Sequence, residues 1–555
     1  MACHVLGISA FYHDSAACIV RDGEVLFAIE EERLSRVKHD ARFPELAVQA
    51  CLDAAGIRAN EVDAVVFYEK TLPKLERQLD TWLAAFPRSY PAFVRTMARY
   101  LDGRMDLAGW LRKRYGFRRE ILFAEHHLSH AAFAWFTSGF QRAMVLVADG
   151  VGEWATTSIW TADAAGLRPQ REIRFPDSLG LFFSLVTAHL GFRVNDDEYK
   201  VMGLAAYGHD AYARAMTELL PLDLDGAFHL DRACIDLAGR DTLATARVTT
   251  LLGPARRPGA RIEQRHRDVA CSAQKHLEAA LLHVLSLVPA GEPLCLAGGV
   301  ALNGLANARI AARHPLHVPF APGDSGAAIG AALVGSHFGL GHPQQRSPLS
   351  PFLGPGFDAA ACASAASDLG AQVQPLAAMG GDAFVAEQLA GARILGFFDG
   401  RMEFGPRALG HRSILADPRD ASMRDALNER VKHREPFRPF APAIAAERAA
   451  EYFDVPHALP WMTEVRTVRP ERRADIAAVV HVDGTARVQT VDATESPRLH
   501  ALLGHFEART GVPVLLNTSF NVAGEPIVCS PHDAIRCSRA AGLHGLVLGE
   551  LWVTC

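Results

Sequence analysis

A group of three short strands occurs twice in this chain, and this repetition limits the possible folds more than any other feature. Near the start, apolar runs alternate with turn residues in HVLGIS, SAACIVRDG and EVLFAIEEE, with turns at 12–14 and 22–23. The same order returns in AMVLVADGVG, ATTSIWTAD and LRPQREIRF. A repeated module of this kind, followed by helical segments such as PELAVQACLDAAG, predicts a duplicated α/β domain.

The actin, sugar-kinase and hexokinase fold is duplicated in this way, with hairpin turns from both halves facing a cleft that holds phosphates. The segment LCLAGGVALNGLANARI fits the same plan as a buried strand, the pair Gly298 and Gly299, and a helix that begins near Asn303. Glycines allow close backbone approach to a ligand, and a helix N-terminus favours an anion. An ordinary strand–helix turn explains the segment equally well.

Composition sets broad limits on the class of protein. The chain has 555 residues, 49% of them hydrophobic and 21% charged, which predicts a globular protein of two to four domains. A net charge of −5 counts against a nucleic-acid partner bound through a global basic field. The ten cysteines form no C-x-x-C pair. We see no signal peptide and no long apolar run, so we expect a cytoplasmic protein without a membrane partner.

A change of composition marks the expected domain boundary. We predict a first domain over 1–345 and a linker or boundary region over 346–384 that is rich in Pro, Ser, Gly and Ala. A second domain over 385–555 should contain strands in RILGFFDG, RVQTV and VPVLLNTSF. Positive charge is concentrated at 403–443, where Arg407, Lys432 and Arg438 lie among Gly and Pro. Arginines in such loops can hold phosphate with paired hydrogen bonds. A solvated basic surface is the alternative.

The stretch AEHHLSHAAFA places His126 and His130 four residues apart, on one face of a helix. Two imidazoles at this spacing can bind one divalent ion, although the pattern alone is more often structural. A metal site needs a further ligand, and Asp324 in the loop GDSG can supply a carboxylate. Such a set suits Fe(II) or another divalent first-row metal, and the sequence does not choose between them.

Other polar groups lie in the turns expected at the cleft. His13 is a possible general base with Asp14 beside it, or else a turn histidine with a local partner. The residues Asp149, Gly150 and Gly152 resemble a turn that approaches phosphate. A charge run such as the one containing Glu198 and Lys200 is more often a solvated face. In the second domain, a polar loop follows a strand and offers Asn517, Ser519 and Asn521 as hydrogen-bonding groups.

The motifs taken together resemble one family. In order they are GISAFYHDSAA, EERLSRVKHD, HHLSHAAFA, ADGVGEWATTS, DEYKVMGLAAYG, AGGVALN, FAPGDSGAAIGAA, EFGPRALGHRSILADPR and LNTSFNVAGEPIV. Nearly the whole chain is similar to the ATP-dependent O-carbamoyltransferases of antibiotic and nodulation-factor biosynthesis. The resemblance implies an actin-type first domain and a YrdC-type second domain. It also implies that carbamoyl phosphate and ATP give carbamoyl-AMP, whose carbamoyl group passes to a small-molecule hydroxyl.

The resemblance also implies roles for particular residues. It assigns a divalent metal, with Fe(II) favoured, to His126, His130 and Asp324, and it assigns the base to His13. A nucleotide-facing set in the first domain follows from the motif matches: Asp149, Gly150, Gly152, Glu198, Lys200, Gly298, Gly299 and Asn303. Tyr199 replaces a glycine common in such sequences, which weakens the assignment of Glu198 and Lys200.

In the second domain, the resemblance implies a carbamoyl-phosphate site at Arg407, Lys432 and Arg438. It extends the adenylate pocket to Arg487 and to the loop with Asn517, Ser519 and Asn521. It places Lys38 at the border of the acceptor pocket, and it implies Mg²⁺ with the ATP. A homodimer would be usual for the family. Because water would hydrolyse carbamoyl-AMP, we predict an enclosed path for this intermediate.

Three other functions remain open on the sequence. A tRNA threonylcarbamoyl transferase would share the histidine pair, but it should carry a long basic stripe. A small-molecule kinase would need neither the histidines nor the arginine-rich segment. A nucleotide-gated binding module would bind ATP without turnover. The acceptor is not identified; the helical, aromatic and basic segment from about 68 to 120 is expected to cover its pocket.

Overall fold

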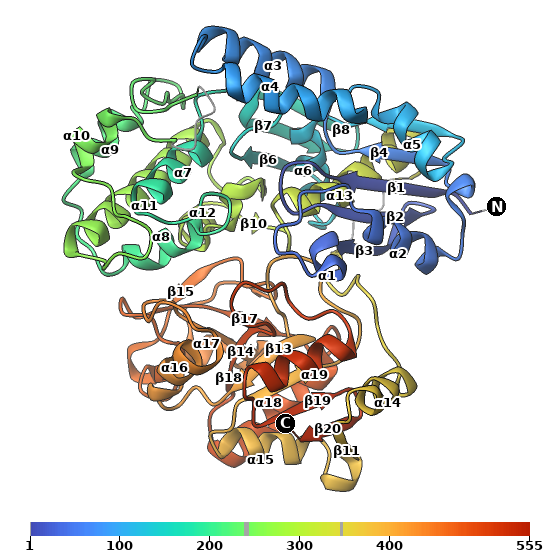
Figure 1. The fold of residues 1–555 in the computed structure, drawn as a ribbon. Coiled ribbons are helices and arrows are strands. Elements are labelled where there is room, and N and C mark those ends of the chain that lie inside the picture. Colours follow the sequence, from blue (N-terminus) through green and yellow to red (C-terminus); the bar gives the residue numbers. More distant parts are fainter. Residues whose placement is uncertain (1, 238–242, 344–347, 555) are drawn as a thin grey trace. The chain divides into compact units, whose positions relative to one another are not determined.

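The computed structural model describes residues 2–237, 243–343 and 348–554 (Figure 1). The chain forms two compact units. The first contains Met1–Ala28 and Ala41–Leu349, and the second contains Ile29–Asp40 and Ser350–Cys555. The predicted first domain, 1–345, therefore differs from the first unit mainly in the short segment Ile29–Asp40, which packs with the second unit.

The first sheet of the first unit has the strand order β3-β2-β1-β4-β5. Its strands are β1 (His4–Ser9), β2 (Ala16–Arg21), β3 (Glu24–Glu30), β4 (Ala64–Phe67) and β5 (Glu120–Phe123). Strand β1 is antiparallel to β2 and parallel to β4, which is in turn parallel to β5. The three strands predicted at the N-terminus are confirmed.

The second sheet repeats this arrangement in the order β10-β9-β6-β7-β8. It contains β6 (Ala143–Ala148), β7 (Ala155–Asp163), β8 (Gly166–Arg174), β9 (Leu294–Ala297) and β10 (Leu316–His317). Here β6 is antiparallel to β7 and parallel to β9, as β1 is to β2 and β4. The predicted duplication is confirmed, and with it the α/β fold class of the first domain.

Two buried helices occupy the centre of the first unit, α6 (His126–Phe136) and α13 (Asp324–Val334). They pack so closely that a Cβ atom on Gly330 would lie 1.8 Å from the carbonyl oxygen of Ser129. Such contact requires glycine, because any side chain would push the helices apart. This packing brings the starts of both helices to one place.

The remaining helices of the first unit lie outside this centre. They are α2 (Glu45–Ala55), α3 (Thr71–Ala84), α4 (Tyr90–Arg99), α5 (Leu107–Tyr115), α7 (Leu179–His189), α8 (Glu198–Ala205), α9 (Ala213–Leu219), α10 (Ala246–Leu252), α11 (Gln264–Val284) and α12 (Gly304–Ala311). Figure 1 shows α7, α8, α9 and α12 gathered around the long α11. The helices α3, α4 and α5 confirm the helical character predicted for 68–120.

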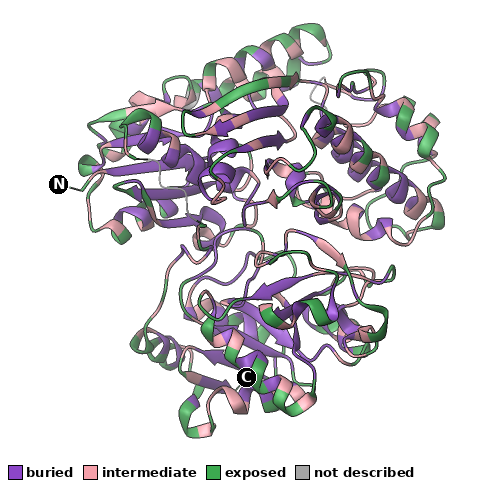
Figure 2. Ribbon diagram, turned by 180° about the vertical axis from the view of Figure 1, so that it is seen from behind, coloured by how far each residue is buried: buried purple, intermediate pink, exposed green. Residues whose placement is uncertain are grey.

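The second unit is built on an eight-stranded mixed sheet in the order β11-β20-β19-β12-β13-β18-β14-β17. The strands are β11 (Gln372–Pro375), β12 (Leu395–Phe398), β13 (Arg412–Ala416), β14 (Ala441–Ala445), β17 (Gln489–Val491), β18 (Val514–Ser519), β19 (Gly545–Leu548) and β20 (Leu551–Thr554). A small sheet pairs β15 (Val465–Thr467) with β16 (Thr485–Arg487). The strands are largely buried in both units, as Figure 2 shows.

Helices of the second unit surround this sheet. They are α1 (Glu31–Ser35), α14 (Ala359–Asp368), α15 (Asp382–Ala390), α16 (Ser422–Ala426), α17 (Ala449–Tyr452), α18 (Pro497–Thr510) and α19 (Pro531–Ala540). The α/β class predicted for the second domain is confirmed.

The region 346–384, predicted as a linker or boundary, contains the division between the two units after Leu349, and most of it is folded. Residues 346 and 347 lie outside the described residues, but the rest contains α14 and the edge strand β11. Cys362, Ala365 and Leu376 are buried in the core of the second unit. The small residues that look like a linker in sequence are there because α14 packs closely on this core.

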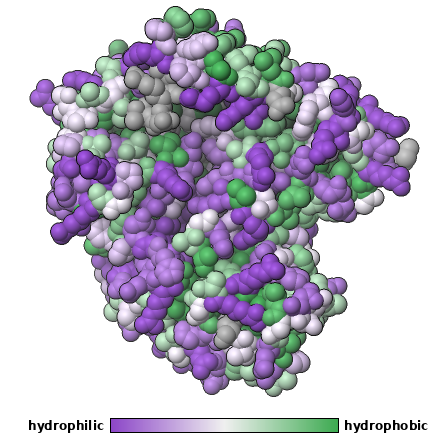
Figure 3. Space-filling model, viewed as in Figure 1, coloured by the Kyte–Doolittle hydropathy of each residue, from purple (hydrophilic) through white to green (hydrophobic). Residues whose placement is uncertain are grey.

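Among the described residues, no helix combines the length and the apolar character needed to cross a bilayer. On the face shown in Figure 3, hydrophilic side chains predominate and hydrophobic ones are scattered between them.

Candidate functional site

Four side chains converge in the first unit, the buried His126, His130 and Asp324 and the partly buried Asp149. Their ligand atoms all lie within 4.8 Å of one another. His126 Nε2 lies 3.1 Å from His130 Nε2 and 3.0 Å from Asp149 Oδ2. His130 Nε2 lies 3.3 Å from both Asp149 Oδ2 and Asp324 Oδ1. Two imidazole nitrogens and two carboxylate oxygens therefore face one small volume.

The secondary structure delivers each of these groups to the same point. His126 and His130 lie on successive turns of α6, Asp149 follows the C-terminal end of β6, and Asp324 begins α13. The side chain of Glu153 accepts hydrogen bonds from the backbone N–H groups of His126 and Lys70, at 3.0 and 2.7 Å. This carboxylate satisfies an otherwise unpaired donor at the start of α6 and so holds the first histidine in place.

The donor set fits a divalent metal ion. A ligand distance of about 2.1 Å and a right angle between ligands put neighbouring donor atoms about 3.0 Å apart, close to the distances in this cluster. The side chains are 2%, 0% and 3% exposed for His126, His130 and Asp324, respectively. Within the described residues, Nδ1 of each histidine and Oδ2 of Asp324 are buried without a hydrogen bond. The Nε2 atoms face the two carboxylates, as imidazoles that share a metal ion with carboxylates would.

The cluster includes one residue that the sequence analysis placed elsewhere. Asp149 was predicted in a phosphate-approaching turn, but its Oδ2 faces both histidines. Its Oδ1 accepts hydrogen bonds from the N–H groups of Gly150 at 2.7 Å and Gly299 at 3.3 Å. Asp149 therefore connects the histidine cluster to both glycine loops, and it is a fourth potential ligand beside the three that were predicted.

The charges of the cluster are strongly coupled. Burial alone would raise the pKa of Asp149, but hydrogen bonds with His126 and His130 hold it well below its ordinary value. Burial would likewise lower the pKa of His130, yet Asp149 and Asp324 raise it to about 9. In the absence of a metal, protons on the imidazoles balance the two carboxylates.

His13 and Asp14 lie in the turn between β1 and β2, next to this cluster. His13 Nε2 lies 3.9 Å from Asp324 Oδ2, and its Nδ1 lies 2.9 Å from Asp14 Oδ2. Burial opposes protonation, but the hydrogen bond to Asp14 and the charge of Asp324 raise the pKa of His13 to about 9. One ring nitrogen is therefore held by a carboxylate while the other faces the four-residue cluster.

The glycines predicted at the cleft surround the same point. Gly298 has φ +88°, and a Cβ there would lie 2.2 Å from the carbonyl oxygen of Ala148. A Cβ on Gly152 would lie 3.0 Å from the side chain of His126. Glycine at these positions allows the β6 and β9 loops to approach each other and the histidine. A direct contact between these loops and a nucleotide stays a prediction.

Three residues of the predicted nucleotide-facing set make local contacts in the structure. Asn303 caps α12 by accepting from the N–H of Ala306, and it exchanges two amide hydrogen bonds with Gln274 on α11. Glu198 accepts from the hydroxyl of Ser184 and from the backbone of Asn195, and Lys200 pairs with Asp197 at 2.9 Å. Nucleotide binding by Asn303, Glu198 and Lys200 stays a prediction.

In the second unit, the predicted cationic residues form one electrostatic group. The pKa of Arg487 is held well below its ordinary value by burial and by the charges of Arg407, Arg434 and Arg438. Its Nε is buried and has no hydrogen-bond partner among the described residues. Arg434 was not predicted as a site residue. Cations gathered in this way repel one another, and a bound anion would relieve the repulsion.

Lys432 connects the predicted polar loop to this group. Its ammonium donates to Asn521 Oδ1 at 2.8 Å, to the Asn521 carbonyl at 2.9 Å and to Ser519 Oγ at 3.3 Å. Burial and the charges of Arg434 and Arg438 hold the pKa of Lys432 well below its ordinary value. Asn517 donates to the Ala408 carbonyl at 3.2 Å, beside Arg407. The structure thus brings together the second-domain residues that were predicted from the sequence.

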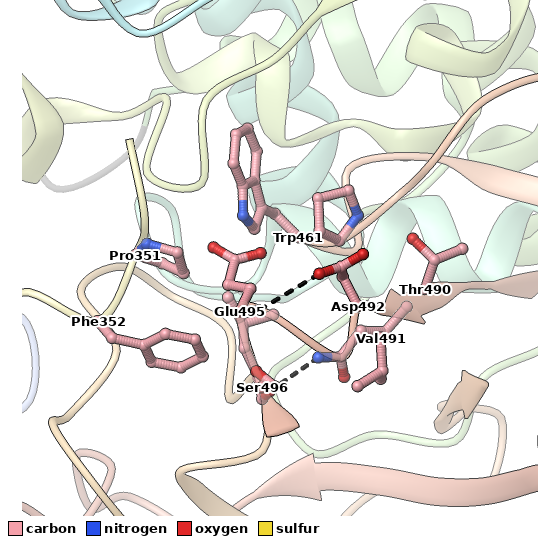
Figure 4. Close-up of a pocket in the computed structure, with 11 residues that line it drawn as sticks. Pro351, Phe352, Trp461, Thr490, Val491, Asp492, Glu495 and Ser496 are labelled. Atoms are coloured by element: carbon pink, nitrogen blue, oxygen red, sulfur yellow. Dashed lines mark hydrogen bonds between the residues drawn. The ribbon is translucent and has the colours of Figure 1, made fainter. Parts of the chain in front are cut away.

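An open pocket of about 210 Å³ adjoins this network. It is lined by Pro351, Phe352, Leu409, Pro460, Trp461, Gln489, Thr490, Val491, Asp492, Glu495 and Ser496. Figure 4 shows the carboxylates of Asp492 and Glu495 on the same side of the pocket as Trp461. Two carboxylates would repel phosphate, so the phosphate-binding assignment depends on the arginines rather than on this pocket.

Lys38 belongs to Ile29–Asp40 and therefore folds with the second unit. Its predicted place at the border of the acceptor pocket stays a prediction.

Comparison with known proteins matches both parts of the chain to one family. The family model described as the carbamoyltransferase N-terminus matches residues 4–333, and the one described as the carbamoyltransferase C-terminus matches residues 386–554. The chain belongs to the carbamoyltransferase family. The resemblance predicted from the sequence is confirmed, and membership of this family makes the protein a transferase.

Three relatives show how far the similarity extends along this carbamoyltransferase. An uncharacterised protein of Synechocystis is 43% identical over 98% of this chain and 95% of its own. The nodulation protein NolNO of Sinorhizobium fredii is 38% identical over 98% of this chain and 79% of its own. The 3'-hydroxymethylcephem-O-carbamoyltransferase of Amycolatopsis lactamdurans is 43% identical over 30% of this chain and 31% of its own.

Proposed function

We propose that this carbamoyltransferase makes carbamoyl-AMP from carbamoyl phosphate and ATP, and transfers the carbamoyl group to a hydroxyl of a small molecule. The observation that supports this most is the presence of two sites of opposite charge in one chain. Buried carboxylates and imidazoles meet in the first unit, and mutually repelling cations meet in the second. A relative whose name specifies O-carbamoylation of a hydroxymethyl group supports the choice of acceptor.

The second unit would carry out the activation. Water cleaves carbamoyl phosphate to carbamate and inorganic phosphate. A carbamate oxygen then attacks the α-phosphorus of ATP, so that a new P–O bond forms and pyrophosphate leaves with its bonding electrons. Arg407, Arg438 and Arg487 would bind the phosphates and the charge that develops on them, and Mg²⁺ would accompany the ATP.

The first unit would carry out the transfer. The acceptor oxygen attacks the carbonyl carbon of carbamoyl-AMP, the bond to the phosphate oxygen breaks, and AMP leaves. His13 takes the hydroxyl proton at Nε2, while Asp14 orients the ring through Nδ1. A divalent metal held by His126, His130, Asp149 and Asp324 would polarise the carbonyl or phosphate oxygen and oppose protonation of His13.

The first test omits the acceptor. Purified protein is incubated with ATP and carbamoyl phosphate, and the nucleotides are analysed by mass. We expect carbamoyl-AMP or AMP together with pyrophosphate, and an almost complete loss of both in Arg407→Ala. Arg419→Ala is the matched control, since Arg419 lies in the same arginine-rich segment but pairs with Asp417 at 2.7 Å. ADP as the only product would favour a kinase and would contradict the proposal.

A further inference from the structure

The short segment Ile29–Asp40, which we call the anchoring segment, folds with the second unit although its sequence position lies within the predicted first domain. It contains α1 and has several buried charged side chains. Glu30 is 4% exposed and Arg33 is 3% exposed. Charged groups are buried at this level only when they have partners that require them. The partners of these two side chains are the backbone of one loop and carboxylates of the segment itself, since Arg33 pairs with Glu30 at 3.5 Å and also with Glu32. Arg36 of the same segment reaches a second loop.

The first loop contains Arg407. The N–H of Gly405 donates to Glu30 Oε1 at 2.7 Å, and Arg33 Nη2 donates to the carbonyl oxygen of Gly405 at 2.7 Å. Both backbone polar groups of Gly405 are therefore held by the anchoring segment, two positions before Arg407. On the other side, Glu403 accepts from the N–H of Leu409 at 2.7 Å. Arg407 lies between two fixed points of its loop.

The second loop contains Asn521. Arg36 donates through Nη1 to the carbonyl oxygen of Ile527 at 2.7 Å and through Nη2 to that of Pro526 at 2.9 Å. Within the same loop, the amide of Asn521 donates to the carbonyl oxygen of Glu525 at 2.7 Å. Arg36 therefore fixes the end of the loop whose beginning supplies the acceptors for Lys432.

We propose that Glu30, Arg33 and Arg36 are positioning residues for the formation of carbamoyl-AMP, because they fix the two loops that carry Arg407 and Asn521. This inference rests on the proposed function of the second unit. A displacement of about 1 Å in a catalytic group can cost about 100-fold in rate. Loss of these anchors should therefore reduce the reaction well before it affects folding.

A comparison of Glu30→Gln with Glu30→Ala tests whether the hydrogen bond that Glu30 accepts from Gly405 is what positions the loop. Burial raises the pKa of Glu30 to about 7, so the site already tolerates a neutral side chain. Glutamine keeps an oxygen that can accept from the N–H of Gly405, whereas alanine does not. A positioning role predicts pyrophosphate formation within about threefold of wild type for Glu30→Gln and a loss of at least tenfold for Glu30→Ala.

Arg36→Ala is the main variant, and Arg401→Ala is its matched control. Arg401 also donates to two backbone carbonyls, those of Leu353 at 2.6 Å and Gly354 at 3.1 Å, but it holds neither of the two loops. The full-length proteins are compared by pyrophosphate release without acceptor, by thermal unfolding and by hydrogen–deuterium exchange. We expect Arg36→Ala to lose at least tenfold in kcat/KM for carbamoyl phosphate, with faster exchange confined to the Asn521 loop. Arg401→Ala should stay within about threefold of wild type.

The outcomes separate this inference from the proposed function. If the wild type releases no pyrophosphate from carbamoyl phosphate and ATP, the proposed function fails. If the wild type is active and Arg36→Ala matches Arg401→Ala in rate and in exchange of the Asn521 loop, the positioning role is wrong. If Glu30→Ala does not fold, Glu30→Gln and Arg36→Ala decide, because Arg36 is partly exposed and its replacement leaves no buried cavity.

Discussion

The four-residue cluster of the first unit and the arginine group of the second solve opposite electrostatic problems. In the cluster, buried carboxylates raise the pKa of His130 to about 9, so protons can stand in for a cation. In the arginine group, guanidinium stays protonated in proteins, so the cations cannot lower their mutual repulsion by losing protons. The first site can therefore adjust its charge by protonation before its ligand binds, whereas in the second a bound anion would reduce the repulsion on Arg487.

The substitution His130→Ala should distinguish the functions of the two sites most clearly. His130→Ala removes the imidazole that faces both Asp149 and Asp324, so we expect at least a 100-fold loss of metal affinity and a comparable loss of carbamoyl transfer. Pyrophosphate formation without acceptor should be retained. Metal content is measured by elemental analysis, and each half-reaction is measured separately.

His283→Ala is a suitable control for that variant, because His283 is also a first-unit histidine but its ring hydrogen-bonds to the carbonyl oxygen of Ala227, at 3.1 Å, and not to the four-residue cluster. Its metal content should equal that of wild type. Full metal content in His130→Ala would contradict the four-residue site.

Removal of Arg487 should have two opposite effects. Arg487→Met removes a buried cation that Arg407, Arg434 and Arg438 repel, so the protein without substrates should be as stable as wild type or more stable by about 1–4 kcal/mol. Pyrophosphate formation should fall about 100-fold, because the phosphates lose a contact. Thermal unfolding and pyrophosphate release measure the two effects. A less stable variant would mean that Arg487 has an anion-independent structural role.

Replacement of Asp149 tests the ligand that was not predicted. Asp149→Asn keeps an oxygen for the glycine loops but removes one negative charge beside His126 and His130. We expect metal affinity to fall about 10- to 100-fold, a range seen for changes around metal ligands. Isothermal titration with Fe(II) or Zn²⁺ measures this. Unchanged affinity would return Asp149 to the phosphate-turn role predicted from its sequence.

The case of Asp149 shows where the sequence was sufficient and where it was not. Repeated strand patterns predicted the duplicated sheet, and the spacing of His126 and His130 predicted a shared helix face, because both follow from local periodicity. The phosphate-approaching turn at Asp149 was also predicted from local sequence alone, namely a strand followed by Asp-Gly. Only the packing of α6 against β6 shows that Asp149 turns its second oxygen to the histidines.

The anchoring segment was missed for a similar reason. Its contact with Gly405 spans 375 residues of sequence from Glu30, and no local pattern encodes such a distance. The same limit applies to Asn303, whose place after a strand and two glycines predicted a ligand contact. Its hydrogen bonds with the start of α12 and with Gln274 were not predicted.

The two sites should differ in the pH dependence of ligand binding. We expect this difference to be smaller than the effects of the substitutions described above. Because the pKa of His130 without metal is about 9, a metal ion must displace a proton from it at any lower pH. Apparent metal affinity should therefore rise about tenfold per pH unit from pH 6.5 to 8.5 and level off above pH 9. Metal titrations at three pH values measure this slope.

Pyrophosphate formation provides the internal comparison, since arginines bear the same charge across that range and should impose no such slope. A flat metal profile would show that His130 is neutral before the metal binds, which would remove the contrast between the two sites.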